Sequence, residues 1–228
     1  MPSLSQVLRK YAEQGSAALL PAADEIVQHG HLAEYLRDFL RREPGAPFEE
    51  DPVAYRHPNG FTKIRLASLN DYGWAIRLHV WAEQASDYDI HSHRWNFASR
   101  VLSGSLTEET YALAGRETGN YSMYRCASSV NGRYSLNFQH DCDVTLVSKN
   151  SYDEGFSYER DAKTLHMAYA TPASPAVTLF VQGSERDDFT TVISRPGFDT
   201  RRDIVAPRCN RPELIELLRE VTDLICCD

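Results

Sequence analysis

The sequence lacks the features by which membrane-spanning, secreted and nucleic-acid-binding chains are recognised. No apolar run approaches the ~20 residues that a bilayer-spanning helix needs. No basic patch followed by a long apolar stretch opens the chain, so we expect no signal peptide. The 24 Lys and Arg residues against 32 Asp and Glu give a formal net charge of −8. This charge argues against a nucleic-acid surface, because phosphate binding needs clustered cations.

Cysteine is also scarce, and its placement excludes a disulfide framework. None of the five cysteines has the spacing of a zinc knuckle or of a redox motif. Cys226 and Cys227 are adjacent near the end of the chain, and we interpret them as a solvated terminus rather than a redox pair. We therefore expect reduced thiols in a cytoplasmic protein.

The most informative stretch runs from Asp89 to Phe97 and contains His91 and His93. Its residues favour a strand, in which side chains alternate between faces, so the two histidines should point the same way. Two imidazoles on one face are half of a metal site. The alternative is a pair of surface histidines on an edge strand.

Two further features place these histidines in a known pattern. Gly104 separates two strand-like segments and predicts a hairpin, and Gly155 precedes His166 by eleven positions. The arrangement resembles the two motifs of the cupin superfamily, whose histidines bind a metal inside a β-barrel. The second motif is degenerate, because Asp161, Lys163 and Ala170 stand where the family has proline, glycine and asparagine.

The site departs from the common cupin pattern at Phe97, which stands where a glutamate ligand would be. His91, His93 and His166 remain, and three imidazoles suit iron, nickel, copper or zinc. Among cupins this set resembles the thiol dioxygenases, particularly cysteine dioxygenase, which implies Fe(II). In the mammalian-type enzymes a cysteine at the position of Phe97 is crosslinked to a tyrosine, and this chain lacks that crosslink.

The resemblance also implies a substrate site. Arg65 lies at about the place of the family's carboxylate-binding arginine, although a salt bridge with a nearby acid is an equal alternative for a buried arginine. Tyr158 and Tyr169, like Tyr152, flank the second motif and are candidate hydrogen-bond donors to substrate, or else packing residues. The remaining candidates for the pocket wall are Arg77, His79, Trp81, Trp95 and Phe97.

Two other histidine groups are interpreted without a metal. His140-Asp141-Cys142-Asp143 lies between two strand-like segments, and we expect a hairpin turn there. His29 and His31 have the same spacing as the metal pair, but on a helix this places them on different faces. We expect both to be solvated.

The predicted fold is a mainly β, cupin-type jelly-roll barrel with N-terminal helices and a C-terminal helix, forming one structural domain. Residues 1–50 show helical spacing, with a first helix capped by Ser3 or Ser5 and a second from about Ala22 to Leu40. Residues 51–195 form the barrel, with Asn131-Gly132 as its strongest hairpin signal. Residues 196–228 end in a helix that starts at Asn210. The strands are expected at 61–68, 73–83, 88–102, 105–112, 120–126, 133–139, 142–149, 163–170, 176–182 and 188–194. The front helices should pack on the barrel or form a homodimer contact.

Three functions fit these features. The first is a non-haem iron dioxygenase acting on dioxygen and a small, carboxylate-bearing amino-acid-like or thiol substrate. The second is a metal cupin without redox chemistry, namely an isomerase, lyase or hydrolase. The third is a ligand-binding cupin whose histidines are remnants. None of the three needs a nucleic acid or a membrane as partner.

Overall fold

The computed structural model describes residues 2–43, 46, 48, 50–57, 59–81, 89–115, 119–127, 133–170, 175–195 and 203–226. The helices are α1 (Leu4–Ala12), the short 3-10 helix η1 (Ser16–Ala18), α2 (Leu19–Gln28), α3 (His31–Arg41) and α4 (Arg211–Ile225). The strands are β1 (Val53–Arg56), β2 (Phe61–Leu69), β3 (Trp74–Trp81), β4 (Ile90–His91), β5 (Trp95–Ser103), β6 (Ser105–Leu113), β7 (Tyr121–Ala127), β8 (Arg133–Cys142), β9 (Val144–Asp153), β10 (Ser157–Arg160), β11 (Leu165–Ala170), β12 (Ala176–Glu185), β13 (Phe189–Ser194) and β14 (Asp203–Val205).

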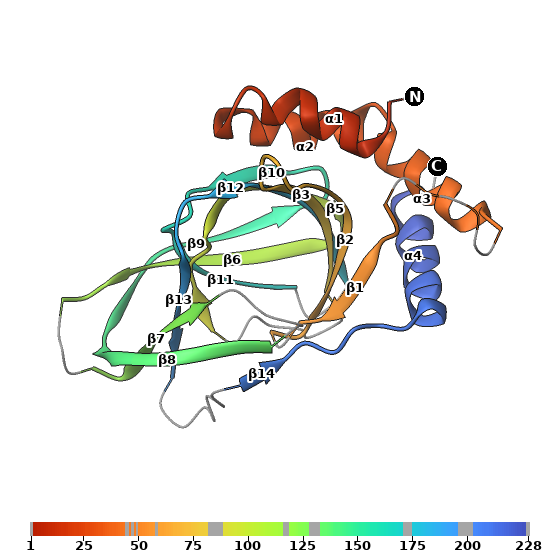
Figure 1. Ribbon diagram of the computed structural model, residues 1–228. Helices are drawn as coiled ribbons and strands as arrows, with labels where there is room; N and C mark the ends of the chain where they lie inside the picture. Colours follow the sequence, from red (N-terminus) through yellow and green to blue (C-terminus); the bar gives the residue numbers. More distant parts are fainter. Residues whose placement is uncertain are drawn as a thin grey trace.

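The strands form two antiparallel sheets that enclose a barrel (Figure 1). One sheet has the order β1-β2-β3-β12-β5-β10, and the other has the order β14-β8-β7-β13-β4-β11-β6-β9. The chain crosses between the sheets at β3–β4, β4–β5, β5–β6, β9–β10, β10–β11, β11–β12 and β12–β13. Such alternation is typical of a jelly roll, so the predicted mainly β, cupin-type jelly-roll fold with helices at both ends is confirmed.

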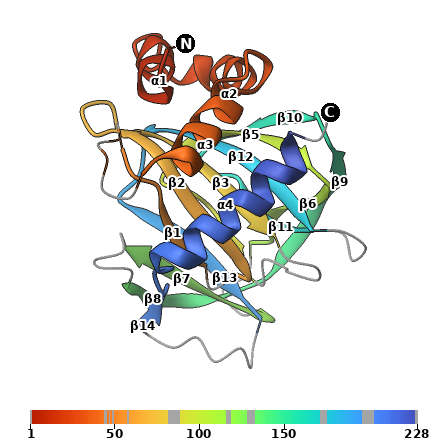
Figure 2. The ribbon, with the colours of Figure 1, turned by 90° about the vertical axis from the view of Figure 1, so that its right-hand side faces the viewer.

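The helices cover the outside of the six-stranded sheet. In Figures 1 and 2, α1 and α2 lie across β2, β3, β12 and β5, while α3 and α4 lie side by side at one end. Ile64 of β2 and Leu78 of β3 are register partners, and both are fully buried in the core shared with the helices. The neighbouring residues Lys63 and His79 are also register partners and face the opposite way, into the barrel.

Both helix starts found in the sequence are confirmed. Ser3 and Gln6 form a capping box at the start of α1, and Asn210 and Glu213 form one at the start of α4. No helix in the described part of the chain is both long enough and apolar enough to cross a membrane.

The prediction of one helix from Ala22 to Leu40 was wrong. Gly30 has a left-handed conformation with φ of 72°, and it separates α2 from α3. Glycine adopts this conformation without steric cost, which makes it a common helix terminator. The break turns His31 inward, so that its exposure is 7%, and the prediction that it is solvated was wrong, whereas His29 is exposed as expected.

The strand expected at 88–102 is two strands. β4 belongs to the eight-stranded sheet and β5 to the six-stranded sheet, so residues 92–94 form the crossover between them.

The prediction of a hairpin turn around His140 was also wrong. β8 continues to Cys142 and pairs with β7, whereas β9 pairs with β6. Asn131-Gly132 lies outside the described residues, although β7 and β8 form an antiparallel pair on either side of it.

Gly104 is a position where the fold requires glycine. Its φ is 74°, and a Cβ atom there would lie 2.4 Å from the carbonyl oxygen of Pro175. Gly155 has a similar φ of 86°, but no heavy atom lies within 4 Å of its Cβ position. We expect Gly155→Ala to lower the free energy of unfolding by about 1–3 kcal/mol through backbone strain. Gly104→Ala should cost about 1–3 kcal/mol more through overpacking. Urea denaturation of both variants checks this, and equal losses would contradict the steric argument.

Candidate metal centre

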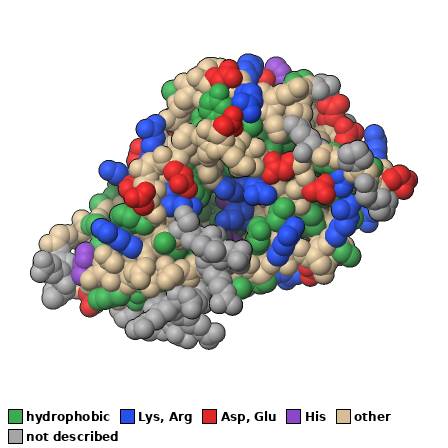
Figure 3. Space-filling view, in the orientation of Figure 1, with side chains coloured by type: hydrophobic (Ala, Val, Ile, Leu, Met, Phe, Trp, Pro, Cys, Tyr) green, Lys and Arg blue, Asp and Glu red, His purple; other side chains and the backbone are tan. Residues whose placement is uncertain are grey.

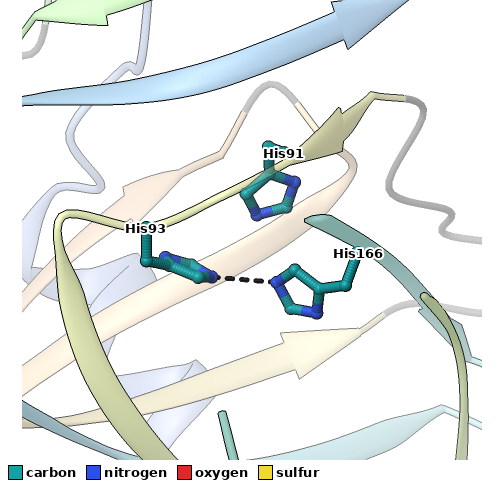
Figure 4. A group of neighbouring side chains, drawn as sticks. All are labelled: His91, His93 and His166. Carbon is teal, nitrogen blue, oxygen red and sulfur yellow. Dashed lines mark hydrogen bonds between the residues drawn. The ribbon is translucent and has the colours of Figure 1, made fainter. Parts of the chain in front are cut away.

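His91, His93 and His166 come together inside the barrel from three different pieces of chain. His91 ends β4, His93 lies in the crossover to β5, and His166 lies on β11 as the register partner of His91. Figure 4 shows the three rings pointing toward a common point. The ring centroids are 4.9 to 5.1 Å apart, and the candidate ligand atoms all lie within 4.8 Å of one another. Among the described residues, no other group of three His, Cys, Asp or Glu residues has this geometry.

Hydrogen bonds at the back of two rings fix which nitrogen is available to a metal. His166 Nδ1 lies 2.8 Å from Glu108 Oε1, and His91 Nδ1 lies 3.1 Å from the carbonyl oxygen of Asp89. A carboxylate and a carbonyl can only accept, so both Nδ1 atoms donate. In a neutral ring this leaves Nε2 unprotonated and able to bind a metal.

The spacing of the nitrogens fits a metal ion. His93 Nε2 and His166 Nε2 are 2.9 Å apart. Two nitrogens bound to one metal at ~2.1 Å and at a right angle would be about 3 Å apart. Burial lowers the pKa of His91 and places that of His93, which also has imidazoles near it, well below the usual range. Neutral imidazoles are the form that ligates metals, so the residues present fit a metal centre.

Glu108 of β6 is the residue of the centre that the sequence analysis missed. It is fully buried and holds His166 on one side and Arg160 on the other. Arg160 Nε lies 3.2 Å from Glu108 Oε1, and the Tyr152 hydroxyl donates to Oε2 over 3.2 Å. Burial alone would raise the pKa of Glu108, but the hydrogen bonds from His166 and Arg160 lower it below the usual value. The available signal was its strand phase, because Glu108 is two residues from the buried Leu106 and therefore lies on the same inward face of β6.

A cavity of about 240 Å³ opens beside the histidines. Figure 3 shows it as a hollow near the middle of one face, where cationic side chains and a histidine are visible. Its wall combines aromatic groups with the cations Lys63, Arg77 and Arg94. The described lining residues are His57, Asn59, Phe61, Lys63, Arg77, His79, Asp89, His91, Ser92, His93, Arg94, Trp95, Cys126, Ala127, Tyr134, Leu136, Phe180, Thr190 and Val192.

The structure places several predicted pocket residues at or near this cavity. Arg77, His79 and Trp95 line it. Phe97 is buried, with its ring 4.8 Å from that of His93 and stacked on Phe180 at 4.5 Å. Trp81 is buried 4.3 Å from the ring of Phe61 and lies behind the wall rather than in it. Lys63 was missed, although it is two residues from Arg65 in the same strand and period two places both on one face.

Three predicted catalytic residues lie elsewhere. The side chain of Arg65 is 45% exposed, and its Nε lies 3.3 Å from Glu50. Arg65 therefore forms a salt bridge with a nearby acid, which was the alternative to substrate binding. Arg65 is the register partner of Arg77 and shares its face of the sheet, but its side chain is exposed and does not line the cavity. Tyr158 is buried behind Phe97 and stacks on Tyr152 at 4.5 Å.

Tyr169 lies on the opposite face of β11 from His166. Its hydroxyl donates to Glu109 over 2.9 Å, and Lys149 lies over its ring. The alternation of β11 explains this, because Ala168 and Ala170 take the inward positions beside His166, as predicted. None of Arg65, Tyr158 and Tyr169 lines the cavity.

Comparison with known proteins gives matches only among solved structures. No protein-family model and no curated protein matches the sequence. An RmlC-like cupin from Shewanella frigidimarina matches 64% of this chain and 96% of its own at 14% identity and a TM-score of 0.37. Hydroquinone 1,2-dioxygenase PnpCD, in complex with Cd²⁺ and 4-hydroxybenzonitrile, matches 54% of this chain and 63% of its own at 11% identity and a TM-score of 0.35.

A third solved structure is HEPD from Streptomyces albus, with 2-hydroxyethylphosphonate and Fe(II) bound. It matches 59% of this chain and 24% of its own at 7% identity and a TM-score of 0.37. At these identities and TM-scores the three matches carry no conclusion about the activity of this chain. The residues of the centre itself therefore carry the evidence for function.

Proposed function

We propose that this chain is a metal-dependent cupin enzyme, a non-haem iron oxygenase acting on a small carboxylate-bearing substrate of the amino-acid or thiol kind. The observation that carries the proposal is the convergence of His91, His93 and His166 beside a cavity with a cationic wall. The resemblance of the sequence to three-histidine thiol dioxygenases favours iron. Bound ferrous iron would supply the redox chemistry by which dioxygen oxidises an organic substrate.

The residues of the centre would have different roles. The three neutral imidazoles hold the metal without cancelling its charge, and Glu108 and the Asp89 carbonyl hold two of the rings in place. Phe97 and Phe180 form an apolar wall beside His93 that keeps water from that side. Phe97 stands where the mammalian-type cysteine dioxygenases carry their crosslinked cysteine, which argues against cysteine itself as the substrate.

Metal analysis and oxygen uptake test the proposal together. The protein is purified without chelator and without nickel affinity, analysed for metal, loaded anaerobically with Fe(II), and assayed with a panel of thiols, amino acids and other small acids. We expect near-stoichiometric iron and uptake that depends on one class of substrate. Zinc or nickel without uptake would replace the oxygenase by a redox-neutral metal enzyme, since the same donors suit those ions. No metal at all would leave a ligand-binding module.

A further inference from the structure

The cavity wall carries more positive than negative charge. Among its described lining residues, Lys63, Arg77 and Arg94 are cationic and Asp89 is the one carboxylate. Arg94 is paired with Glu185 at 2.9 Å, and Asp89 accepts a hydrogen bond from Ser194. Lys63 and Arg77 form no salt bridge within the part of the chain that the structure describes. Two cations inside a barrel without a counter-charge are costly, which points to a ligand that supplies one.

Lys63 and Arg77 lie on one continuous face. Lys63 of β2 is the register partner of His79 of β3, and Arg77 is two residues from His79 on the same side of the strand. The guanidinium of Arg77 lies 5.3 Å from the centre of the Trp95 ring, which holds it against the wall. Trp95 Nε1 and His79 Nε2 are buried without a hydrogen-bond partner. Buried polar atoms are rarely left unpaired, so this wall has hydrogen-bonding capacity that the described chain does not use.

We propose that Lys63, Arg77, His79 and Trp95 form a binding site for a compact dianion, either a small dicarboxylate or a phosphate or phosphonate monoester. The inference rests on the proposed function in taking this dianion to be the anionic part of the substrate. Two unpaired cations match two negative charges, whereas a monocarboxylate neutralises one of them. Within the proposed class of small acidic substrates, the wall favours a dianion over a simple amino acid, because an ammonium group would face cations with Asp89 as the one carboxylate among the described lining residues. The volume of about 240 Å³ lies below the ~300–1,000 Å³ typical of sites for drug-sized ligands, so the ligand is small.

The ionisation of the two cations agrees with this geometry. Burial, with Arg77 and Arg94 nearby, lowers the pKa of Lys63 to about 7. Burial and the nearby Arg65 lower the pKa of Arg77 to about 10. A bound dianion would reverse both shifts, because an opposite charge favours the protonated form of a base.

Calorimetric titration at low ionic strength tests the inference. The probes are succinate, methylphosphonate and inorganic phosphate, with acetate and alanine as the monoanion and the zwitterion. The full chain is titrated as purified and again after chelation of metal. We expect the dianions to bind at least tenfold more tightly than acetate and alanine in both preparations. Preference for succinate would assign a dicarboxylate, and preference for methylphosphonate or phosphate would assign a phosphoryl group. Equal affinities for monoanions and dianions would overturn the inference.

Substitutions locate the site. Lys63→Gln and Arg77→Gln should each weaken dianion binding by about 10- to 100-fold, the usual effect of losing a charge-assisted hydrogen bond. Lys149→Gln removes an exposed cation outside the cavity and should have no effect. Neither cavity variant should lower the melting temperature, because each removes an unpaired cation. If one of the two variants folds poorly, the binding measured with the other still tests the inference. Loss of binding in Arg65→Gln with retention in Arg77→Gln would overturn the inference in favour of the arginine suggested by the sequence.

The outcomes separate this inference from the proposed function. Dianion binding by a protein that holds no metal would support the site and refute the iron oxygenase. A metal-loaded, oxygen-consuming protein whose affinity for succinate and methylphosphonate is indifferent to Lys63→Gln and Arg77→Gln would refute the dianion site alone.

Discussion

Replacing His93 by alanine should lower the metal affinity by more than a hundredfold while the barrel stays folded. His93 supplies one of three nitrogens, and losing even a hydrogen-bond partner of a ligand typically lowers affinity by about 10–100-fold. The side chain borders a cavity and is partly exposed, so its removal leaves the main core between sheet and helices intact. The measurement is the metal content after dialysis, together with competition against a chelator of known affinity.

His140→Ala is the matched control for this experiment. His140 is exposed on β8 and belongs to no described group that could hold a metal, so its loss should leave the metal content unchanged. Circular dichroism of both variants checks that the fold is retained. If His93→Ala kept stoichiometric metal, or if His140→Ala lost it, the assignment of the centre would be wrong.

The three histidines could be predicted because the information that places them is local. His91 and His93 are two residues apart, and His166 follows Gly155 at a fixed separation, so strand alternation and one motif suffice. The strand break between His91 and Trp95 did not disturb the prediction. The crossover at 92–94 keeps both rings inside the barrel, because each sheet turns its inner face to the same cavity.

The residues of the cavity wall were harder to predict, because their positions depend on pairing between strands. Period two assigns Lys63 and Arg65 to the same face, and their register partners His79 and Arg77 agree with this. Only Lys63 lines the cavity, because Arg65 is exposed and paired with Glu50. An ion pair of this kind leaves no mark in the hydrophobic pattern. The same limit applies to Tyr158. Its side chain points into the barrel, but it lies behind Phe97 and not at the cavity.

The break at Gly30 and the burial of Glu108 illustrate a different limit. An isolated glycine within a helical pattern is compatible with a continuous helix, and tertiary packing decides whether the chain turns there. A glutamate is assigned to the surface by default, because burial of a lone carboxylate is costly. Glu108 is buried because His166 and Arg160, 58 and 52 residues away in sequence, satisfy it from opposite sides. Neither partner can be recognised before the strands are paired.

Glu108 is therefore the residue whose removal should most affect both stability and metal binding. Glu108→Leu leaves Arg160 without its partner inside the barrel, and breaking a buried ion pair costs about 3–5 kcal/mol. We expect about 3 kcal/mol, the lower end, because 20% of the Arg160 side chain is exposed to water. Metal affinity should also fall by about 10–100-fold, because His166 loses the acceptor that fixes its ring. Urea denaturation of the metal-free protein and chelator competition measure the two effects separately.

A double variant at Glu108 and Arg160 distinguishes ion pairing from simple packing. Glu108→Leu combined with Arg160→Leu removes both charges and should recover much of the lost stability, but not the metal affinity, since His166 still lacks its acceptor. Asp71→Asn breaks the exposed pair with Arg9 and should change stability little, because exposed ion pairs contribute little. A double variant as unstable as the single one would show that Glu108 stabilises the barrel through its shape rather than its charge. Restored metal affinity in the double variant would show that the carboxylate does not orient His166.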